Sequence, residues 1–375
     1  MFPELFCCVN RMVSSVPFTD IYMDDAMIRR ASDVLRSGRF VKGPEAARFE
    51  AEFAEACGAA DAVAVSSGTA SLYLALDGVG VGPGDEVFVP GHTFFASASP
   101  VLALGATPVF VDVDPDYYTM DPGALRDAVE SADSPAAVVP VHIYGQVADM
   151  AAIGKVAAEY DLAVVEDACQ AHLATRDGRA AGTFGDAGCF SFYPSKNMTV
   201  GGDGGILVTD DEALADEARA LRNHGRIDGD HVAMGLNFRL DETNAAIGRE
   251  QLRHLPDWNG ARAEAAAAYT ERLADVPEVT TPTEAPDSRH VYHLYVIRAD
   301  DRDGLRAHLD DAGIGTGIHY STPAHRHEAV RAHVDPPTLP VTEGLTERIL
   351  SLPMHPRLTD EEIGYVCEHV RGYYA

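Results

Sequence analysis

The chain is short of positive charge, and of lysine in particular. Its 375 residues include 29 lysines and arginines against 58 aspartates and glutamates, and only Lys42, Lys155 and Lys196 are lysines. The net charge of −29 repels phosphate backbones and anionic membranes, so we expect neither a nucleic-acid nor a membrane partner. An acidic surface is tolerated best where salt screens its self-repulsion. The plainer interpretation of the charge is an ordinary solvated surface, and its size suggests the further hypothesis of a halophilic protein.

Paired cysteines and long apolar runs are also missing. Apart from one adjacent pair the six cysteines are scattered: Cys7, Cys8, Cys57, Cys169, Cys189 and Cys367. This spacing predicts neither a disulfide framework nor a CxxC metal pair. No apolar run approaches the roughly 18 to 20 residues of a membrane span, and the N-terminus lacks a basic region followed by a cleavage site. We expect a cytoplasmic protein with no metal site.

Residues 1–15 are interpreted as an N-terminal extension. They hold a short apolar patch that is interrupted by Glu4. Met12 begins a stretch that would also make a natural start, which leaves open whether the first eleven residues are translated.

From Ala62 to about Val208 short apolar runs alternate with helical patterns. Such runs, separated by helices, predict a mostly parallel sheet buried on both faces, and hence an α/β fold. Two longer helices follow, DETNAAIGREQLRHL and GARAEAAAAYTERLAD. A smaller α/β unit comes last, with strands HVYHLYVIRA and GTGIHY around the helix DRDGLRAHLDDAG. We predict a large domain over 16–255 and a small C-terminal domain over 256–375.

Lys196 lies in CFSFYPSKNMTVGGDGGILVT, at the end of a predicted strand and beside four glycines. A primary amine can lose its proton in a desolvated site and condense with a carbonyl, whereas a guanidinium cannot. This placement favours a Schiff-base lysine, and with it pyridoxal phosphate. The plainer alternative is a lysine that neutralises acidic neighbours such as Asp203.

Pyridoxal phosphate also needs an acid beside its ring nitrogen and a cup for its phosphate. The apolar strand in DLAVVEDACQAH delivers Asp167 at its end, although such an Asp is as often a cap or turn residue. In AVAVSSGTASLYLAL a strand turns through Ser67, Gly68 and Thr69 into a helix, which aims free N–H groups at an anion. Many helices begin with such a cap. Neither a Walker loop nor GxGxxG is present.

Several motifs then occur in order along the chain: SSGT, PGHTFFAS, EDACQAH, SFYPSKN with GGDGG, LRNHGR and NFRLDETNAAIG. Together they resemble the DegT/DnrJ/StrS family of sugar aminotransferases, which depend on pyridoxal phosphate and have the type I aminotransferase fold. The resemblance runs over nearly the whole chain from about Val16. His172 is followed by Leu173 where Gly is more usual, and Cys169 stands where Ala often does. Relatives that dehydrate sugars carry His at the position of Lys196.

The resemblance implies a role for each matching residue. Lys196 would form the internal aldimine and shuttle the proton, and Asp167 would hold the pyridine nitrogen. The other implied cofactor contacts are Gln170 near the ring hydroxyl, Phe94 stacked on the ring, and Gly68, Thr69 and Ser191 at the phosphate. Phe94 as plain core and Ser191 as a strand-end cap remain alternatives.

The resemblance also implies an obligate homodimer with shared active sites. Asn237 would reach the partner subunit's phosphate, with Arg239 as a rival for that contact. His319 and Tyr320 in GIHYSTPAH would face the substrate, with core or surface roles as alternatives.

The implied reaction moves an amino group from L-glutamate to a nucleotide-linked ketosugar. The sequence leaves open which sugar, carbon and nucleotide are involved. Two other functions remain open at this stage. One is a relative that aminates another ketone, such as an aminocyclitol or aromatic precursor. The other is a regulatory protein without turnover, although the intact Lys196, Asp167 and Gln170 argue against it.

Overall fold

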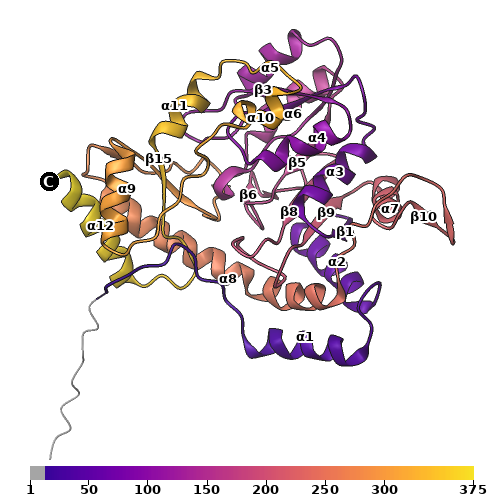
Figure 1. Cartoon of the computed structure of the whole chain (residues 1–375), viewed down its shortest axis with the longest axis horizontal. Helices are drawn as coiled ribbons and strands as arrows, with labels where there is room; N and C mark the ends of the chain where they lie inside the picture. Colours follow the sequence, from indigo (N-terminus) through magenta and orange to yellow (C-terminus); the bar gives the residue numbers. More distant parts are fainter. Residues whose placement is uncertain (1–12) are drawn as a thin grey trace, which may run out of the picture.

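A computed structural model describes residues 13–375 of the chain, and the N-terminal cysteine pair and Met12 lie outside the described residues. Its centre is a seven-stranded sheet (Figure 1). In spatial order the strands are β1 (Asp61–Val65), β9 (Gly205–Thr209), β8 (Ala187–Ser191), β5 (Ala163–Asp167), β4 (Pro135–Val138), β2 (Glu86–Pro90) and β3 (Thr107–Val111). Only β9 runs antiparallel to its neighbours, so the predicted mostly parallel α/β sheet is confirmed.

Side chains on the strands alternate between two cores, as a sheet covered on both faces requires. On β1, Ala62 and Ala64 belong to one apolar cluster and Val63 and Val65 to the other. The first cluster is covered by α2 (Pro44–Cys57), α5 (Pro122–Glu130) and α6 (Met150–Glu159). The second is covered by α3 (Gly68–Gly78), α4 (Ser99–Ala103) and α7 (Glu212–Leu221).

The two longer helices predicted after the sheet are one helix. α8 (Glu242–Leu273) has 32 residues and carries Pro256 inside it. A proline removes one backbone hydrogen bond, but apolar side chains on both sides of it stay buried, among them Leu255 and Tyr269. Their burial holds the helix continuous across the break. The predicted domain boundary at residue 255 falls within α8, and the division of the chain there stays a prediction.

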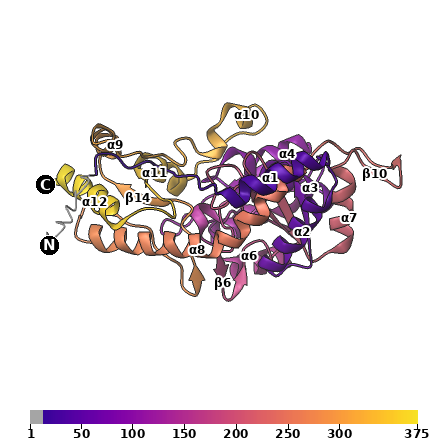
Figure 2. The same ribbon diagram turned by 90° about the horizontal axis from the view of Figure 1, so that it is seen from below.

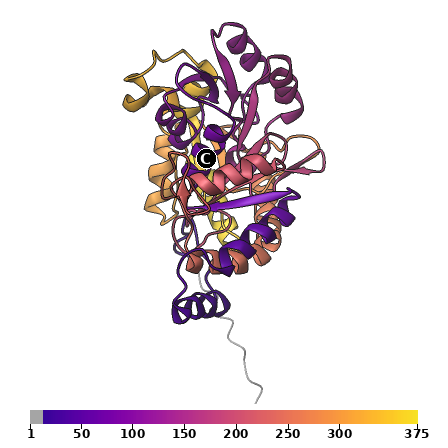
Figure 3. The ribbon, with the colours of Figure 1, turned by 90° about the vertical axis from the view of Figure 1, so that its right-hand side faces the viewer.

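α8 runs along one side of the molecule and connects its two ends (Figure 2). α1 (Asp25–Ser37) packs against α8 and lies at the edge of the body, away from the main sheet (Figure 3). Gly38 and Gly58 end α1 and α2 with φ values of 70° and 76°. Glycine adopts this left-handed conformation without a Cβ clash.

The C-terminal part forms a three-stranded sheet of β12 (Val279–Thr280), β14 (Tyr295–Ala299) and β15 (Ile349–Leu352), with α9 (Arg302–Asp311) and α12 (Asp360–Tyr374). The predicted strand GTGIHY is wrong, because only Gly317 makes a bridge there, to Ser351. β15, which the prediction missed, takes the place beside β14. Val16 is fully buried in this part and pairs with Ile314.

The remaining elements are short. They are β6 (Thr175–Arg176), β7 (Arg179–Ala180), β10 (Arg226–Ile227), β11 (Asp230–His231), β13 (Ser288–Arg289), α10 (Glu328–Arg331) and α11 (Pro340–Arg348), with single 3₁₀ turns at Phe95–Ser97, Ile143–Gly145 and Ala324–Arg326. β10 and β11 form a hairpin that projects from the body (Figure 1). Across residues 13–375, no helix has the length and apolar character that a membrane crossing needs.

Candidate active site

The predicted functional side chains follow the carboxyl ends of the parallel strands, where ligands collect in such sheets. Ser67 and Gly68 follow β1, Phe94 follows β2, Asp167 ends β5 and Ser191 ends β8. Because these strands are neighbours or near neighbours in the sheet, their ends meet at one edge. The structure therefore brings these residues together at the edge where such sheets bind ligands.

Gly68 and Ser191 touch each other at this edge. A Cβ on Gly68 would lie 2.7 Å from both Ser191 Cβ and Cys169 Sγ. Gly205, the last glycine of GGDGG, is equally confined, since its Cβ would lie 2.4 Å from the carbonyl of Ser67. The glycines therefore let three backbone segments approach around the start of α3.

The start of α3 has the properties of an anion cup. Ser67 caps the helix by accepting the amide of Ala70 at 3.1 Å. The amides of Gly68 and Thr69 find no acceptor within residues 13–375, and Thr69 is exposed. Free amides at a helix N-terminus, backed by the helix dipole, favour a phosphate group.

Asp167 presents a buried carboxylate beside this cup. It is 6% exposed. Its Oδ1 accepts the amide of Cys169 at 3.1 Å, and its Oδ2 accepts the hydroxyl of Ser97 at 2.6 Å. Within residues 13–375 this carboxylate has no ion pair. A buried carboxylate is costly unless a cation neutralises it, so the site fits a cationic ring nitrogen of pyridoxal phosphate.

Lys196 lies on the loop between β8 and β9, where its amide donates to the carbonyl of Tyr193 at 2.8 Å. Desolvation lowers the pKa of the Lys196 amine, while Cys169 and Asp167 act in the opposite direction. Burial thus favours the neutral amine. This is the form that can attack a carbonyl or remove a proton.

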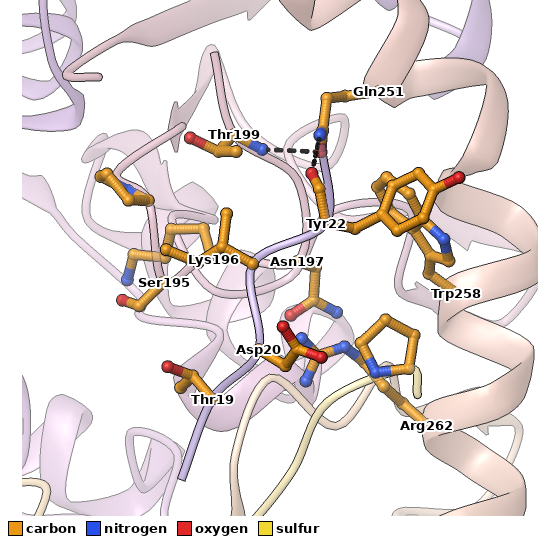
Figure 4. Close-up of a pocket in the computed structure, with 13 residues that line it drawn as sticks. Thr19, Asp20, Tyr22, Ser195, Lys196, Asn197, Thr199, Gln251, Trp258 and Arg262 are labelled. Atoms are coloured by element: carbon orange, nitrogen blue, oxygen red, sulfur yellow. Dashed lines mark hydrogen bonds between the residues drawn. The ribbon is translucent and has the colours of Figure 1, made fainter. Parts of the chain in front are cut away.

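The loop of Lys196 is held from behind by α8 and by the segment that precedes α1 (Figure 4). Gln251 of α8 accepts the amide of Thr199 at 3.2 Å and donates to the carbonyl of Tyr22 at 2.8 Å. Asn197 is buried and donates to Asn259 Oδ1 at 2.9 Å. These bonds fix the segment that directly follows the reactive lysine. They also make Asn197 inaccessible to glycosylation.

Gln170 and Tyr320 meet at the mouth of the site. Gln170 accepts the amide of Tyr144 at 2.6 Å and donates to the hydroxyl of Tyr320 at 2.9 Å. The ring of Tyr320 lies 5.6 Å from that of Phe94, which is 55% exposed. The exposure argues against the alternative that Phe94 is plain core. Tyr320 contacts Gln170, and the carbonyl of His319 accepts the hydroxyl of Tyr144. That His319 and Tyr320 face the substrate stays a prediction.

Asn237 and Arg239 lie on the segment beside the anion cup, where Asn237 is exposed and Arg239 is half-buried. The amide of Ser66 donates to the carbonyl of Phe238 at 2.8 Å, which ties this segment to the end of β1. Arg239 donates to Asn223 Oδ1 at 2.8 Å. Asn237 is exposed, and its side chain has no hydrogen bond within residues 13–375.

Glu166, which precedes Asp167, has a structural role. It accepts the amides of Gly182 at 2.8 Å and Gly185 at 2.8 Å and lies 2.7 Å from His142 Nε2. The strand alternation sends its side chain to the opposite face from Asp167.

Three residues of the site were missed. Ser97 and Thr93 are in the quoted PGHTFFAS motif, and Tyr144 follows β4, where its hydroxyl lies 2.6 Å from His92 Nε2. Burial lowers the pKa of His92 to about 4, so this histidine is neutral near pH 7. The motif was the available signal for Ser97 and Thr93, but nothing in the sequence distinguishes their hydroxyls from ordinary turn residues.

The described residues contain no group of three or more His, Cys, Asp and Glu side chains arranged to hold a metal. The site instead combines the N-terminus of a helix, a buried carboxylate and a desolvated amine. Together they match the phosphate, ring nitrogen and aldehyde of pyridoxal phosphate.

Comparisons with known proteins agree with this chemistry. The chain is 44% identical over 365 residues, or 96% of each chain, to a dTDP-3-amino-3,4,6-trideoxy-alpha-D-glucose transaminase of Streptomyces venezuelae. It is 44% identical over 364 residues, covering 95% of this chain and 99% of the relative, to the erythromycin biosynthesis sensory transduction protein EryC1 of Saccharopolyspora erythraea.

The fold also matches solved structures. The crystal structure of S. venezuelae DesV in complex with a ketimine intermediate superposes with a TM-score of 0.93, at 43% identity, over 96% of this chain and 99% of that one. Residues 22–371 match the DegT/DnrJ/EryC1/StrS aminotransferase family. The chain therefore belongs to this family of pyridoxal-phosphate-dependent aminotransferases, and it has their type I fold.

Proposed function

We propose that this aminotransferase moves the amino group of L-glutamate to a nucleotide-linked ketosugar and so makes an aminosugar for polysaccharide or related biosynthesis. The observation that carries the proposal is the meeting of Lys196, Asp167 and the Gly68 turn at one edge of the sheet. We also propose a cytoplasmic location, because glutamate and nucleotide sugars are cytoplasmic metabolites.

When bound, pyridoxal phosphate supplies an electron sink for the charge left on carbon when a proton is removed. Gly68, Thr69 and Ser191 would hold its phosphate, Phe94 would cover one face of its ring, and Gln170 would lie near its ring hydroxyl. Asp167 would keep the ring nitrogen protonated. Nζ of Lys196 would remove the proton from the carbon that bears the amino group, which requires the neutral amine that burial favours.

A cluster of cations supports a phosphorylated sugar substrate. Desolvation lowers the pKa of Lys42, and the charges of Arg239, Arg226 and Arg222 lower it further. Arg222 is paired with Glu50, which leaves Lys42, Arg226 and Arg239 without an ion pair among residues 13–375, on a chain with a net charge of −29. Since Arg239 adjoins the end of β1, the cluster borders the site and would attract the diphosphate of a nucleotide sugar. The transaminase relative from S. venezuelae carries a dTDP-sugar in its name. A ketone without phosphate, such as an aminocyclitol or aromatic precursor, would make no use of these charges.

The regulatory alternative rests on the names of two relatives, a sensory transduction protein and a pleiotropic regulatory protein. Against it stands the desolvated Lys196, because a lysine without a catalytic role has no reason to be held in a site that lowers its pKa. Asp167 also argues against the regulatory alternative. Its buried carboxylate needs a cation, and no cation among residues 13–375 pairs with it.

We further propose a homodimer that shares its active sites. Around the projecting hairpin several apolar side chains are exposed, including Ile227 at 50%, Val232 at 61% and Met234 at 97%. Apolar side chains gathered at a projection indicate a protein contact. Asn237 lies at the base of the same hairpin, and its side chain makes no hydrogen bond within the described residues. It is the better candidate to reach the partner subunit's phosphate, because the Arg239 side chain is hydrogen-bonded to Asn223.

The half-reaction with glutamate tests the proposed chemistry without the unknown sugar. Wild type loaded with pyridoxal phosphate should release one equivalent of 2-oxoglutarate per site. Lys196→Arg should lower the rate by roughly 10²- to 10⁴-fold, the usual contribution of a positioned base. Lys155→Arg, at an exposed position on α6, is the matched control and should behave as wild type. Undiminished turnover in Lys196→Arg would contradict the role of this lysine.

A panel of acceptors then identifies the substrate class. Enzyme whose cofactor carries the amino group should transfer it to dTDP- or UDP-linked 3-ketosugars. The absorption spectrum of the pyridoxal phosphate form should then return. The same ketosugars without nucleotide should react far more slowly, because they lack the charge that the Lys42 cluster attracts. Equal rates for both would favour the non-nucleotide alternative.

A further inference from the structure

Two hydroxyl groups stand behind Asp167, on the turn that follows β2. Ser97 ends the 3₁₀ turn Phe95–Ser97 and is fully buried, and Thr93 is 2% exposed. The hydroxyl oxygens of Thr93 and Ser97 are 2.7 Å apart, and Ser97 Oγ lies 2.6 Å from Asp167 Oδ2. A short chain of hydrogen bonds thus leads from the turn to the carboxylate.

The number of protons that each group can donate fixes the direction of these hydrogen bonds. An ionised carboxylate only accepts hydrogen bonds, so Ser97 must donate its single hydroxyl proton to Asp167. Ser97 can then meet Thr93 only as an acceptor, and Thr93 must donate. A serine that receives one hydrogen bond is a stronger donor to the next group, because hydrogen bonds in a chain polarise one another.

Ser97 does not need Asp167 to satisfy its own hydroxyl. Thr93 is already within reach, and local bonds to backbone carbonyls four residues back are common for serine in turns. The side chain instead contacts a residue that is 70 positions away in the sequence. The contact therefore serves the carboxylate.

We propose that Ser97, supported by Thr93, is a positioning residue that keeps Asp167 ionised beside the ring nitrogen of pyridoxal phosphate. The inference rests on the proposed role of Asp167. A hydrogen bond to the charged form of an acid stabilises that form. With Ser97 on Oδ2 and the amide of Cys169 on Oδ1, both oxygens of the carboxylate accept a hydrogen bond and its orientation is fixed.

The consequence concerns one proton. In a buried pair of carboxylate and pyridinium the proton can sit on either partner, because transfer to oxygen removes both charges from a medium that penalises them. Ser97 and the Cys169 amide disfavour that transfer. The proton then stays on the ring nitrogen, where it makes the cofactor a better electron sink. Without the Ser97 hydroxyl the proton should shift toward Asp167.

The test uses the full-length enzyme loaded with pyridoxal phosphate that carries ¹⁵N in its ring. The ¹⁵N resonance reports directly whether the nitrogen is protonated, independently of turnover. Wild type should give the protonated position, and Ser97→Ala should move toward the unprotonated position. Thr93→Val should move the same way by less. Ser97→Thr retains the hydroxyl and should restore the wild-type resonance.

Kinetics give a second readout. Because Ser97 is fully buried and contacts Asp167, Ser97→Ala should lower kcat of the glutamate half-reaction by roughly tenfold, as expected for the loss of one hydrogen bond, and leave KM nearly unchanged. Ser99→Ala is the matched control, since this half-buried neighbour makes no side-chain hydrogen bond within the described residues. Should Ser97→Ala fail to fold, Thr93→Val and Ser97→Thr carry the comparison.

Asp167→Asn separates failure of this inference from failure of the proposed role of Asp167. If Asp167→Asn shifts the ¹⁵N resonance while Ser97→Ala matches wild type and Ser99→Ala, the inference is overturned and the role of Asp167 stands. If Asp167→Asn also leaves the resonance unchanged, Asp167 does not govern the ring nitrogen, and both are overturned.

Discussion

Lys196 is a reactive residue because of its surroundings. Desolvation lowers the pKa of its amine, and the nearby Cys169 and Asp167 limit that decrease. The result is an amine that loses its proton more readily than a surface lysine and still has a negative partner nearby. Arginine, which replaces lysine almost everywhere else in this chain, stays protonated and cannot form an imine.

Gly68 should be needed for the cofactor rather than for the fold. In Gly68→Ala the new Cβ would lie 2.7 Å from Ser191 Cβ and Cys169 Sγ, so the phosphate cup must open. We expect the affinity for pyridoxal phosphate to fall about tenfold, which corresponds to about 1.4 kcal/mol. Fluorescence titration of apoenzyme measures it. Gly82→Ala, where the structure has open space, is the control, and equal affinities of the two variants would contradict the cup.

The sequence could predict the residues of the site that follow strands, since the alternation of runs and helices places Asp167, Ser191 and Lys196 at the same edge. It could not predict Ser97, whose role depends on a contact with a residue 70 positions away. The role of Asn237 depends on a second chain and stays a prediction.

At the scale of elements, α8 shows why local patterns mislead. Pro256 lies between two helical patterns that the sequence presents as separate, yet buried side chains on both sides keep one helix. The predicted strand GTGIHY failed for the opposite reason. Its pattern fits a strand, but β15 occupies the position beside β14 and leaves it a single bridge.

Two glycines of α8 should respond in opposite ways to alanine. Gly260 faces open space, so Gly260→Ala should stabilise the protein by about 0.5–1 kcal/mol, because alanine loses less backbone entropy in a helix. A Cβ on Gly248 would lie 2.9 Å from Phe49 Cζ and 3.0 Å from Val200 Cγ1. Gly248→Ala should therefore destabilise by about 1–3 kcal/mol. Urea unfolding of both variants tests the packing of α8, and a stabilised Gly248→Ala would contradict it.

At the scale of the whole molecule, buried neutral histidines should make the fold sensitive to acid. Burial lowers the pKa of His92 and of His319 to about 4, below the ordinary value of 6.5. Between these values the unfolded chain binds more protons than the folded one, so stability falls as the pH drops through that window.

Urea unfolding should give a lower free energy of unfolding at about pH 5 than at about pH 7. This interval lies largely above the range in which carboxylates titrate. His92→Gln, which keeps a polar partner for the Tyr144 hydroxyl, should lose less stability over the same interval. A stability that is flat or rises toward pH 5 would contradict the burial of neutral histidine.

The net charge of −29 predicts a response to salt. Raising the ionic strength from about 0.1 M to about 1 M shortens the screening length from about 10 Å to about 3 Å, which relieves repulsion among the acidic groups. We expect the thermal midpoint to rise over this range in KCl. The greatest stability at low ionic strength would count against adaptation to high salt.

The central claim is that Lys196 carries the cofactor, and the scarcity of lysine makes it directly testable. Enzyme loaded with pyridoxal phosphate is reduced with borohydride, which fixes the cofactor on the amine that holds it, and is then digested and analysed by mass spectrometry. The added mass should fall on the peptide that contains Lys196. Label on Lys42 or Lys155 instead, or on no lysine, would contradict the account.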